Sequence, residues 1–118
     1  MGNTIGQANA VSDRALDLRE CKLPSADLKA KTLSGALMSK SDFSGSNMQE
    51  AVLSKVYAVD SDFSGVDFTS SVIDRAALMG SKFVGANFYN AVFTGVGTEG
   101  ADFTDARFED ALIGSQDA

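Results

Sequence analysis

A bulky apolar residue recurs at every fifth position through most of this chain. Residues 16–115 divide into twenty pentads, and the central position is large and apolar in all of them except at Ala58 and Thr98. A small residue, most often Ala or Ser, usually stands two positions before the centre. The central positions are Leu18, Leu23, Leu28, Leu33, Met38, Phe43, Met48, Leu53, Ala58, Phe63, Phe68, Ile73, Leu78, Phe83, Phe88, Phe93, Thr98, Phe103, Phe108 and Ile113. This five-residue period constrains the fold more than any other feature of the sequence.

A period of five fits neither a straight helix nor a straight strand. At about 100° per residue, five residues of an α-helix advance the apolar position by roughly 140°, which spreads it around the helix surface. Side chains alternate with period two in a strand, so every second centre would face water. The chain therefore has to turn once per pentad, with the centre and the residue two positions earlier pointing inward. Glycines at the last pentad position, such as Gly45 and Gly65, suit a corner with unusual φ.

A second period shows how many pentads close one coil. The segment Ser-Asp-Phe-Ser-Gly at 41–45 recurs unchanged at 61–65, twenty residues later. Twenty residues are four pentads, so we expect four sides per coil. The weak centres Ala58 and Thr98 follow Val56 and Val96, which conserve core volume. The predicted fold is all-β: a quadrilateral parallel β-helix of about five coils, right-handed as parallel crossovers generally are.

The repeats predict one domain over residues 16–115. Residues 1–15 are predicted to form an N-terminal segment or cap, in which Ile5, Val11 and a short helix after Ser12 cover the first coil. Residues 116–118 form the C-terminal end. Lys31 stands where a small inward residue belongs, and we expect its stem to reach out to solvent.

The pattern of a small residue, Asp or Asn, Leu or Phe, and two polar or small residues resembles the pentapeptide-repeat family. Runs such as Ala26-Asp27-Leu28 carry this resemblance over about 100 of the 118 residues, and it implies a right-handed quadrilateral β-helix. Residues 106–118 are similar to the end of the repeat in thylakoid lumenal members from plants and cyanobacteria. This implies a location in the thylakoid lumen, with the cytoplasm as the alternative. Those relatives continue into a cysteine-bearing tail, so the resemblance implies a trimmed chain and leaves open whether Cys21 pairs with a missing cysteine.

Composition argues against several classes of function. The net charge of −6 and the isoelectric point near 4.4 disfavour binding of nucleic-acid phosphates, which needs clustered Lys and Arg. No apolar run approaches the roughly 18 to 20 residues needed to cross a bilayer, so we expect no membrane insertion. The chain has no His, its one cysteine is the inward Cys21, and no nucleophile motif or phosphate loop is present. We therefore expect no enzyme activity, no catalytic residues, no cofactor and no metal site.

One face differs from the polar surface that is typical of the family. The outward position before each centre, where the family prefers Asp or Asn, holds Thr, Val or Leu at 32, 52, 72, 92 and 112, and further apolar residues follow across a corner. Such patches usually mark contact with a partner or a docked segment. Two other interpretations stay open: β-branched residues simply favour strands, or a terminus of the chain covers this face. The predicted protein-interaction patch consists of Val52, Tyr57, Val59, Val72, Ala77, Met79 and Val92.

These observations predict a non-catalytic structural or protein-interaction module, by resemblance in the thylakoid lumen, with an unknown protein as its partner. The alternative is a DNA-mimicking regulator of a topoisomerase, as found among other pentapeptide-repeat proteins. Mimicry needs a dense acidic stripe, whereas the outward charges of this chain are spread over the four faces. We expect the chain to be a monomer or a weak dimer.

Overall fold

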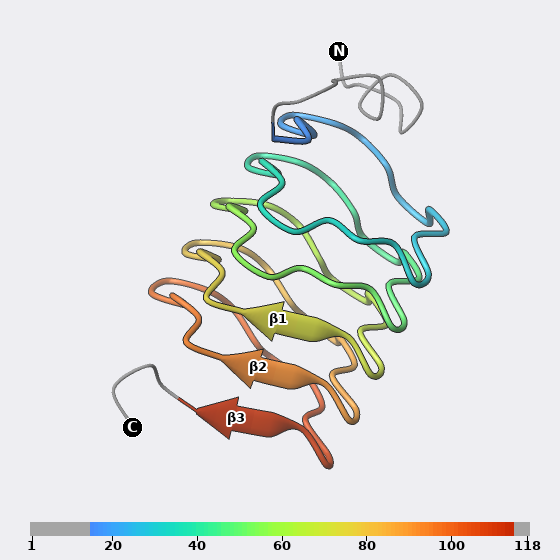
Figure 1. The fold of residues 1–118 in the computed structure, drawn as a ribbon, viewed down its shortest axis with the longest axis vertical. Coiled ribbons are helices and arrows are strands. Elements are labelled where there is room, and N and C mark those ends of the chain that lie inside the picture. The colour runs from blue at the N-terminus through green and yellow to red at the C-terminus, as the bar shows by residue number, and fades with distance from the viewer. Residues whose placement is uncertain (1–14, 115–118) are drawn as a thin grey trace.

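The computed structural model describes residues 15–114 as a stack of four-sided coils around one axis (Figure 1). The coils comprise residues 16–35, 36–55, 56–75, 76–95 and 96–114, and are numbered here from coil one to coil five. Faces 1 to 4 are the four sides whose first centres are Leu18, Leu23, Leu28 and Leu33. Apart from Ala15, the predicted N-terminal cap lies outside the described residues, as does the C-terminal end at 116–118.

Parallel pairing at an interval of twenty residues joins each coil to the next. Face 4 carries three short strands, β1 (Val72–Asp74), β2 (Val92–Thr94) and β3 (Leu112–Gly114), in one parallel sheet of order β1-β2-β3. The other faces pair through single bridges, such as Asp42 with Asp62. This constant interval confirms the predicted four-sided coil. Residues 15–114 contain no helix, and hence none long and apolar enough to cross a bilayer.

Each side ends in a tight turn that needs a left-handed residue. The second residue after the centre has a positive φ at twelve non-glycine and seven glycine positions, from Glu20 to Asp110. Glycine adopts this conformation without strain, whereas other residues adopt it at a cost. In most turns the next N–H donates to the carbonyl of the centre, as from Ser46 to Phe43 (3.1 Å). The predicted glycine corners are therefore confirmed, and other residue types fill the same role at the remaining corners.

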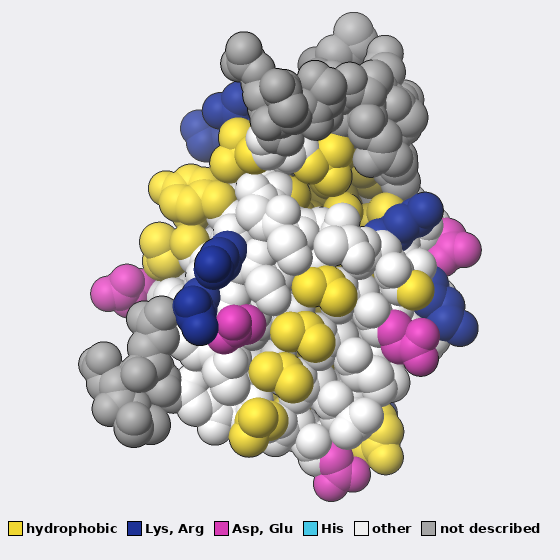
Figure 2. Space-filling model, viewed as in Figure 1, with side chains coloured by type: hydrophobic (Ala, Val, Ile, Leu, Met, Phe, Trp, Pro, Cys, Tyr) yellow, Lys and Arg dark blue, Asp and Glu magenta, His cyan; other side chains and the backbone are white. Residues whose placement is uncertain are grey.

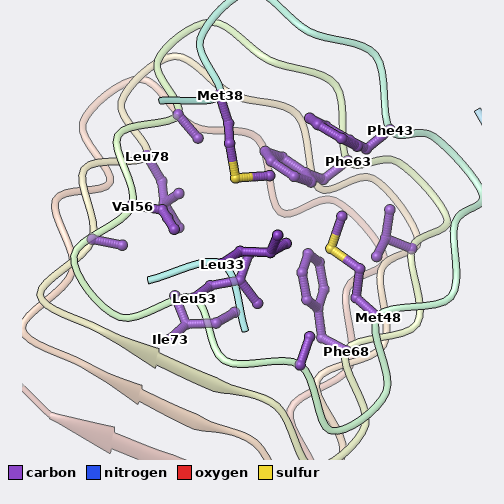
Figure 3. Packing of buried hydrophobic residues seen from close by; sticks show 14 of the residues in the cluster. Leu33, Met38, Phe43, Met48, Leu53, Val56, Phe63, Phe68, Ile73 and Leu78 are labelled. Carbon is purple, nitrogen blue, oxygen red and sulfur yellow. The ribbon is translucent and has the colours of Figure 1, made fainter. Parts of the chain in front are cut away.

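The interior of the coils is filled by stacked apolar side chains. On face 2, the ring of Phe63 lies 5.4 Å from that of Phe43 and 5.1 Å from that of Phe83, with interplanar angles of 8° and 6°. On face 3, Phe68 and Phe88 stack at 4.8 Å. Figure 3 shows the labelled side chains converging from all four faces toward the axis. These ladders confirm the register predicted from the sequence.

Buried serines tie the corner between faces 1 and 2 together. The hydroxyl of Ser81 donates to the carbonyl of Ala58 (2.6 Å) and accepts the N–H of Ser61 (2.9 Å). The hydroxyl of Ser61 likewise donates to the carbonyl of Met38 (2.6 Å) and accepts the N–H of Ser41 (3.2 Å). Each hydroxyl therefore stands between a carbonyl and an N–H of the preceding coil, in a place where most turns have a direct hydrogen bond.

The two irregular positions of coil one behave as predicted. Cys21 is fully buried, and its N–H donates to the hydroxyl of Ser41 (3.1 Å), so the cysteine continues the inward serine column. Lys31 is exposed although it occupies an inward position of the repeat.

Candidate interaction surface

The outward residues of face 4 form a continuous apolar column. Parallel pairing joins Thr32 to Val52, Val52 to Val72, Val72 to Val92 and Val92 to Leu112. The three valines are partly exposed, and Leu112 is 63% exposed. Figure 2 shows hydrophobic side chains in a column over β1, β2 and β3. Leu112, which the sequence places in this row although not in the predicted patch, continues the column beyond Val92.

A second apolar column lies on face 1, across one corner from the first. Tyr57 pairs with Ala77, and Tyr57 is 52% exposed. Val59 and Met79 follow two residues later in the same coils and are partly exposed. The side chain of Met79 lies over Gly97, because a Cβ added at this glycine would meet the Met79 sulfur at 2.9 Å. Sequence reasoning gave no role to Gly97, which leaves room for the methionine.

The structure therefore groups the predicted patch into two columns on adjacent faces: Val52, Val72 and Val92 on face 4, and Tyr57, Val59, Ala77 and Met79 on face 1. The corner between them carries two cations, Lys55 and Arg75. The Arg75 side chain is 57% exposed, and its Nε lies 3.7 Å from Oδ2 of Asp74. Figure 2 shows Lys or Arg side chains beside the apolar column. The two apolar columns are thus separated by a corner that carries the side chains of Lys55 and Arg75.

The valines of face 4 lack a hydrogen bond that acidic and amide residues make at the same pentad position. The N–H of Ser64 donates to the carboxylate of Asp62 (2.9 Å), and the N–H of Gln49 donates to the side-chain oxygen of Asn47 (3.0 Å). This local bond explains why Asp and Asn suit the outward position of a tight turn. A valine gives the bond up and places a branched apolar side chain at the surface instead.

The same local hydrogen bonds set the ionisation of the outward carboxylates. At Asp42, the hydroxyl and N–H of Ser44 hold the pKa below its usual value. At Asp67, burial acts to raise the pKa, but hydrogen bonds from Thr69 and Gln49 outweigh it and the pKa is lowered. These carboxylates are therefore anionic at neutral pH, and the anionic form is the stronger acceptor for the turn hydrogen bonds.

A groove of about 250 Å³ runs along the corner between faces 1 and 2. Its walls carry charges of both signs, and the hydroxyls of Ser41 and Ser61 on its floor already donate to backbone carbonyls. Within residues 15–114, no cluster of three or more His, Cys, Asp or Glu side chains is placed to hold a metal ion. The groove is lined by Glu20, Cys21, Lys22, Lys40, Ser41, Asp42, Asp60, Ser61, Asp62, Gly80 and Lys82.

A sequence profile of pentapeptide repeats matches the chain in eight copies, in segments 15–49, 32–69, 46–83 and 73–110. Because these segments cover most of its length, the chain belongs to the pentapeptide-repeat family. Proteins of this family fold as right-handed quadrilateral β-helices, and the coils described above have that architecture. Members generally act as structural or interaction modules rather than enzymes.

One related protein is the thylakoid lumenal 17.4 kDa protein of Arabidopsis thaliana chloroplasts. It is 54% identical over 56 residues, which cover 46% of this chain and 24% of that protein. The match therefore spans about a quarter of the relative's length. Its location agrees with the resemblance read from residues 106–118.

Two solved structures of other pentapeptide-repeat proteins are similar to this chain. Full-length QnrB1, a plasmid-mediated fluoroquinolone resistance protein, superposes with a TM-score of 0.57 at 15% identity, covering 76% of this chain and 59% of that chain. A pentapeptide repeat protein from the Arabidopsis thaliana thylakoid lumen gives a TM-score of 0.34 at 20% identity, covering 79% and 68% of the two chains. At such identity the likeness to QnrB1 shows the fold alone.

Proposed function

We propose that this chain is a non-catalytic structural and protein-interaction module of the thylakoid lumen, and that its face 4 column is the contact surface for a protein partner. The column Val52, Val72, Val92 and Leu112 is the observation that carries this proposal. At these positions apolar side chains replace the Asp or Asn that would hydrogen bond to its own turn. The replacement gives up local stabilisation and exposes apolar surface, which is the usual property of a binding face.

The surroundings of the column fit a protein surface. Burial of the valines and Leu112 on a partner would stabilise the complex by about 25 cal/mol per Å² of apolar surface. This gain would offset part of the free-energy cost of association. Tyr57 on face 1 adds an exposed aromatic ring, a residue type that is enriched at the centre of protein interfaces. Lys55 and Arg75 between the columns supply cations that would select the orientation of the partner.

The non-catalytic part of the proposal rests on how the reactive side chains are used. The hydroxyls of Ser41 and Ser61 bridge successive coils, and Cys21 is fully buried in the same column. A nucleophile needs a neighbouring base and access to substrate. The serine column has a structural use instead, because it closes the corner between faces 1 and 2.

The location is supported by the related chloroplast protein of the thylakoid lumen, which matches a part of this chain. The alternative function, a DNA-mimicking regulator of a topoisomerase, has the weaker support. A DNA mimic needs a continuous run of negative charge along one side. On face 2, Lys82 interrupts the outward row of Asp42, Asp62 and Asp102, and Lys22 precedes Asp42 in the same row.

Replacing two residues of the surface tests the proposal. The double variant Val72→Asp/Tyr57→Asn places the family's usual outward residues on both columns, and Tyr89→Asn is the matched control because Tyr89 is 45% exposed on face 3. We expect the wild type and the control to retain the same protein from a thylakoid lumen extract, while the double variant loses it without a change in melting temperature. Retention of that protein by the double variant would contradict the proposal. A lowered melting temperature would show instead that the chain itself covers this face.

A further inference from the structure

The sulfur-containing side chains of the described coils differ in their access to solvent. Cys21, Met38 and Met48 are fully buried, with none of their surface exposed. Met79 is partly exposed, because it stands at an outward position of face 1. Within the part of the chain that the structure describes, a small oxidant in solution can therefore reach the sulfur of Met79 without any opening of the fold, and can reach the other sulfurs only after the coils open.

The sulfur of Met79 takes the place of a missing side chain on face 1. Parallel pairing stacks the outward residues of this face in the order Leu37, Tyr57, Ala77 and Gly97. A Cβ built on Gly97 would meet the Met79 sulfur at 2.9 Å, so the thioether occupies the side-chain position that the glycine leaves vacant. The sulfur therefore lies on the outer surface of the sheet and continues the apolar column beyond Ala77.

The exposure of Met79 belongs to the side of the coil stack and not to one of its ends. Its coil is paired on both sides, because the N–H of Asp60 donates to the carbonyl of Met79 (3.0 Å) and the N–H of Gly80 donates to the carbonyl of Glu99 (2.9 Å). Met79 directly follows the buried centre Leu78, and the residue after a centre points outward. Further coils beyond either end would therefore leave the Met79 side chain at the surface.

Hydrogen peroxide converts an accessible thioether into a sulfoxide. A lone pair of the sulfur attacks one peroxide oxygen, the O–O bond breaks as the S–O bond forms, and the second oxygen leaves as water after a proton moves to it. The sulfur loses two electrons and the peroxide gains them. The reaction needs no catalytic side chain, so access to the sulfur decides which methionine reacts. The product carries a polar S–O group where an apolar atom stood.

We propose that Met79 is an oxidation site on the interaction surface, and that its conversion to the sulfoxide by a peroxide weakens partner binding. This inference rests on the proposed function, because it concerns the regulation of that same surface. A sulfoxide oxygen that is buried on a partner without a hydrogen bond loses its hydration at a cost in free energy. The fold itself is kept, because the Met79 side chain packs on the outside of the sheet while Met38 and Met48 stay in the core.

Peptide mapping by mass spectrometry tests the oxidation site. In the native chain treated with hydrogen peroxide, we expect Met79 to be oxidised roughly tenfold or more faster than Met38 and Met48, and all three at similar rates in denaturant. The variant Gly97→Ala places a methyl group where the sulfur lies, so Met79 should be displaced from the sheet and oxidised faster. Equal rates for the three methionines in the native chain would overturn the proposal. An unchanged Met79 rate in Gly97→Ala would contradict the position assigned to the sulfur.

Retention of the lumenal protein by the oxidised chain tests the effect on binding. The chain is treated with hydrogen peroxide, and catalase removes the excess before the extract is added. Met79→Leu is the control, because leucine is apolar and of similar size but cannot form a sulfoxide. We expect oxidation to lower retention by the wild type roughly tenfold or more, without a change in melting temperature, and to leave retention by Met79→Leu unchanged. Unchanged retention by the oxidised wild type, or an equal loss in Met79→Leu, would overturn this inference and leave the proposed function intact. If the untreated wild type retains no protein, the proposed function fails and this inference fails with it.

Discussion

The hydroxyl of Ser61 donates a 2.6 Å hydrogen bond to the carbonyl oxygen of Met38 in the preceding coil. Ser61 also accepts the N–H of Ser41 at 3.2 Å, so one buried side chain replaces a backbone turn bond. Ser71 is equally buried at another corner, but its hydroxyl has no hydrogen-bond partner. The carbonyl of Met48 in the coil before it already accepts the N–H of Ala51 (3.1 Å). Two serines at the same pentad position thus have opposite energetic roles.

This difference predicts opposite effects of the same substitution. Ser61→Ala removes a bridge between two buried backbone groups and should lower the free energy of unfolding by about 1 to 2 kcal/mol. Ser71→Ala removes a buried hydroxyl without a partner, and should leave stability unchanged or raise it by up to about 1 kcal/mol. Denaturant unfolding of both variants measures the two changes in the free energy of unfolding. Equal destabilisation by the two substitutions would show that the serine column has no bridging role.

The phenylalanine ladder predicts where the largest single loss of stability lies. Phe63 is 1% exposed and stacks between Phe43 and Phe83, so Phe63→Ala should leave a cavity and cost about 3 to 5 kcal/mol. The neighbouring Ser64 is a turn residue at the surface, and Ser64→Ala should cost under about 0.5 kcal/mol. Thermal unfolding compares the two. Similar shifts in melting temperature would contradict the register of the coil.

These core and corner positions differ in how far the sequence predicts them. The five-residue period gives the burial of Phe63 and Cys21 directly, because the chain has only one way to turn both the centre and the preceding small residue inward. The roles of Ser61 and Ser71 do not follow from the period. They depend on how each hydroxyl lies against the carbonyl of the coil before, which is a property of two coils together.

The candidate surface shows the same limit. The outward valines of face 4 follow from the period, since Val52, Val72 and Val92 stand twenty residues apart. The period also places the second column across a corner, but the exposure of Lys55 and Arg75 at that corner depends on the shape of the turn between faces 4 and 1. The packing of Met79 over Gly97 likewise needs coordinates, as the two residues belong to different coils.

Burial of Cys21 predicts slow reaction of its thiol. The side chain is fully buried in coil one, and a thiol must reach the reagent as a thiolate to react. Labelling by a thiol reagent should therefore be much slower in the native protein than in the protein unfolded by denaturant. Comparable rates in the two states would mean that coil one opens readily, and would place the end of the stable stack beyond Cys21.

The turn hydrogen bonds of the outward carboxylates predict a loss of stability in acid. The pKa of Asp67 is lowered in the folded state, so its contribution is fully present above the unfolded value of about 3.9 and is lost as the pH falls through the lower folded value. Asp67→Asn keeps the oxygen that accepts the N–H of Thr69, as Asn87 does for Tyr89 (3.1 Å). Between roughly pH 5 and pH 2, the melting temperature of the variant should therefore fall less than that of the wild type. An identical acid transition in both proteins would assign the effect to other carboxylates.

Site-specific photo-crosslinking tests the proposed contact surface of face 4 most directly. A photoreactive phenylalanine derivative at position 72 would sit in the centre of the apolar column. The same group at position 89 serves as the control, since Tyr89 is exposed and lies on face 3, away from this column. In a thylakoid lumen extract, the account predicts one discrete crosslinked protein from position 72 that is absent from position 89 and is displaced by an excess of unmodified wild-type chain. No discrete product from position 72, or the same products from both positions, would contradict the claim that face 4 binds a protein partner.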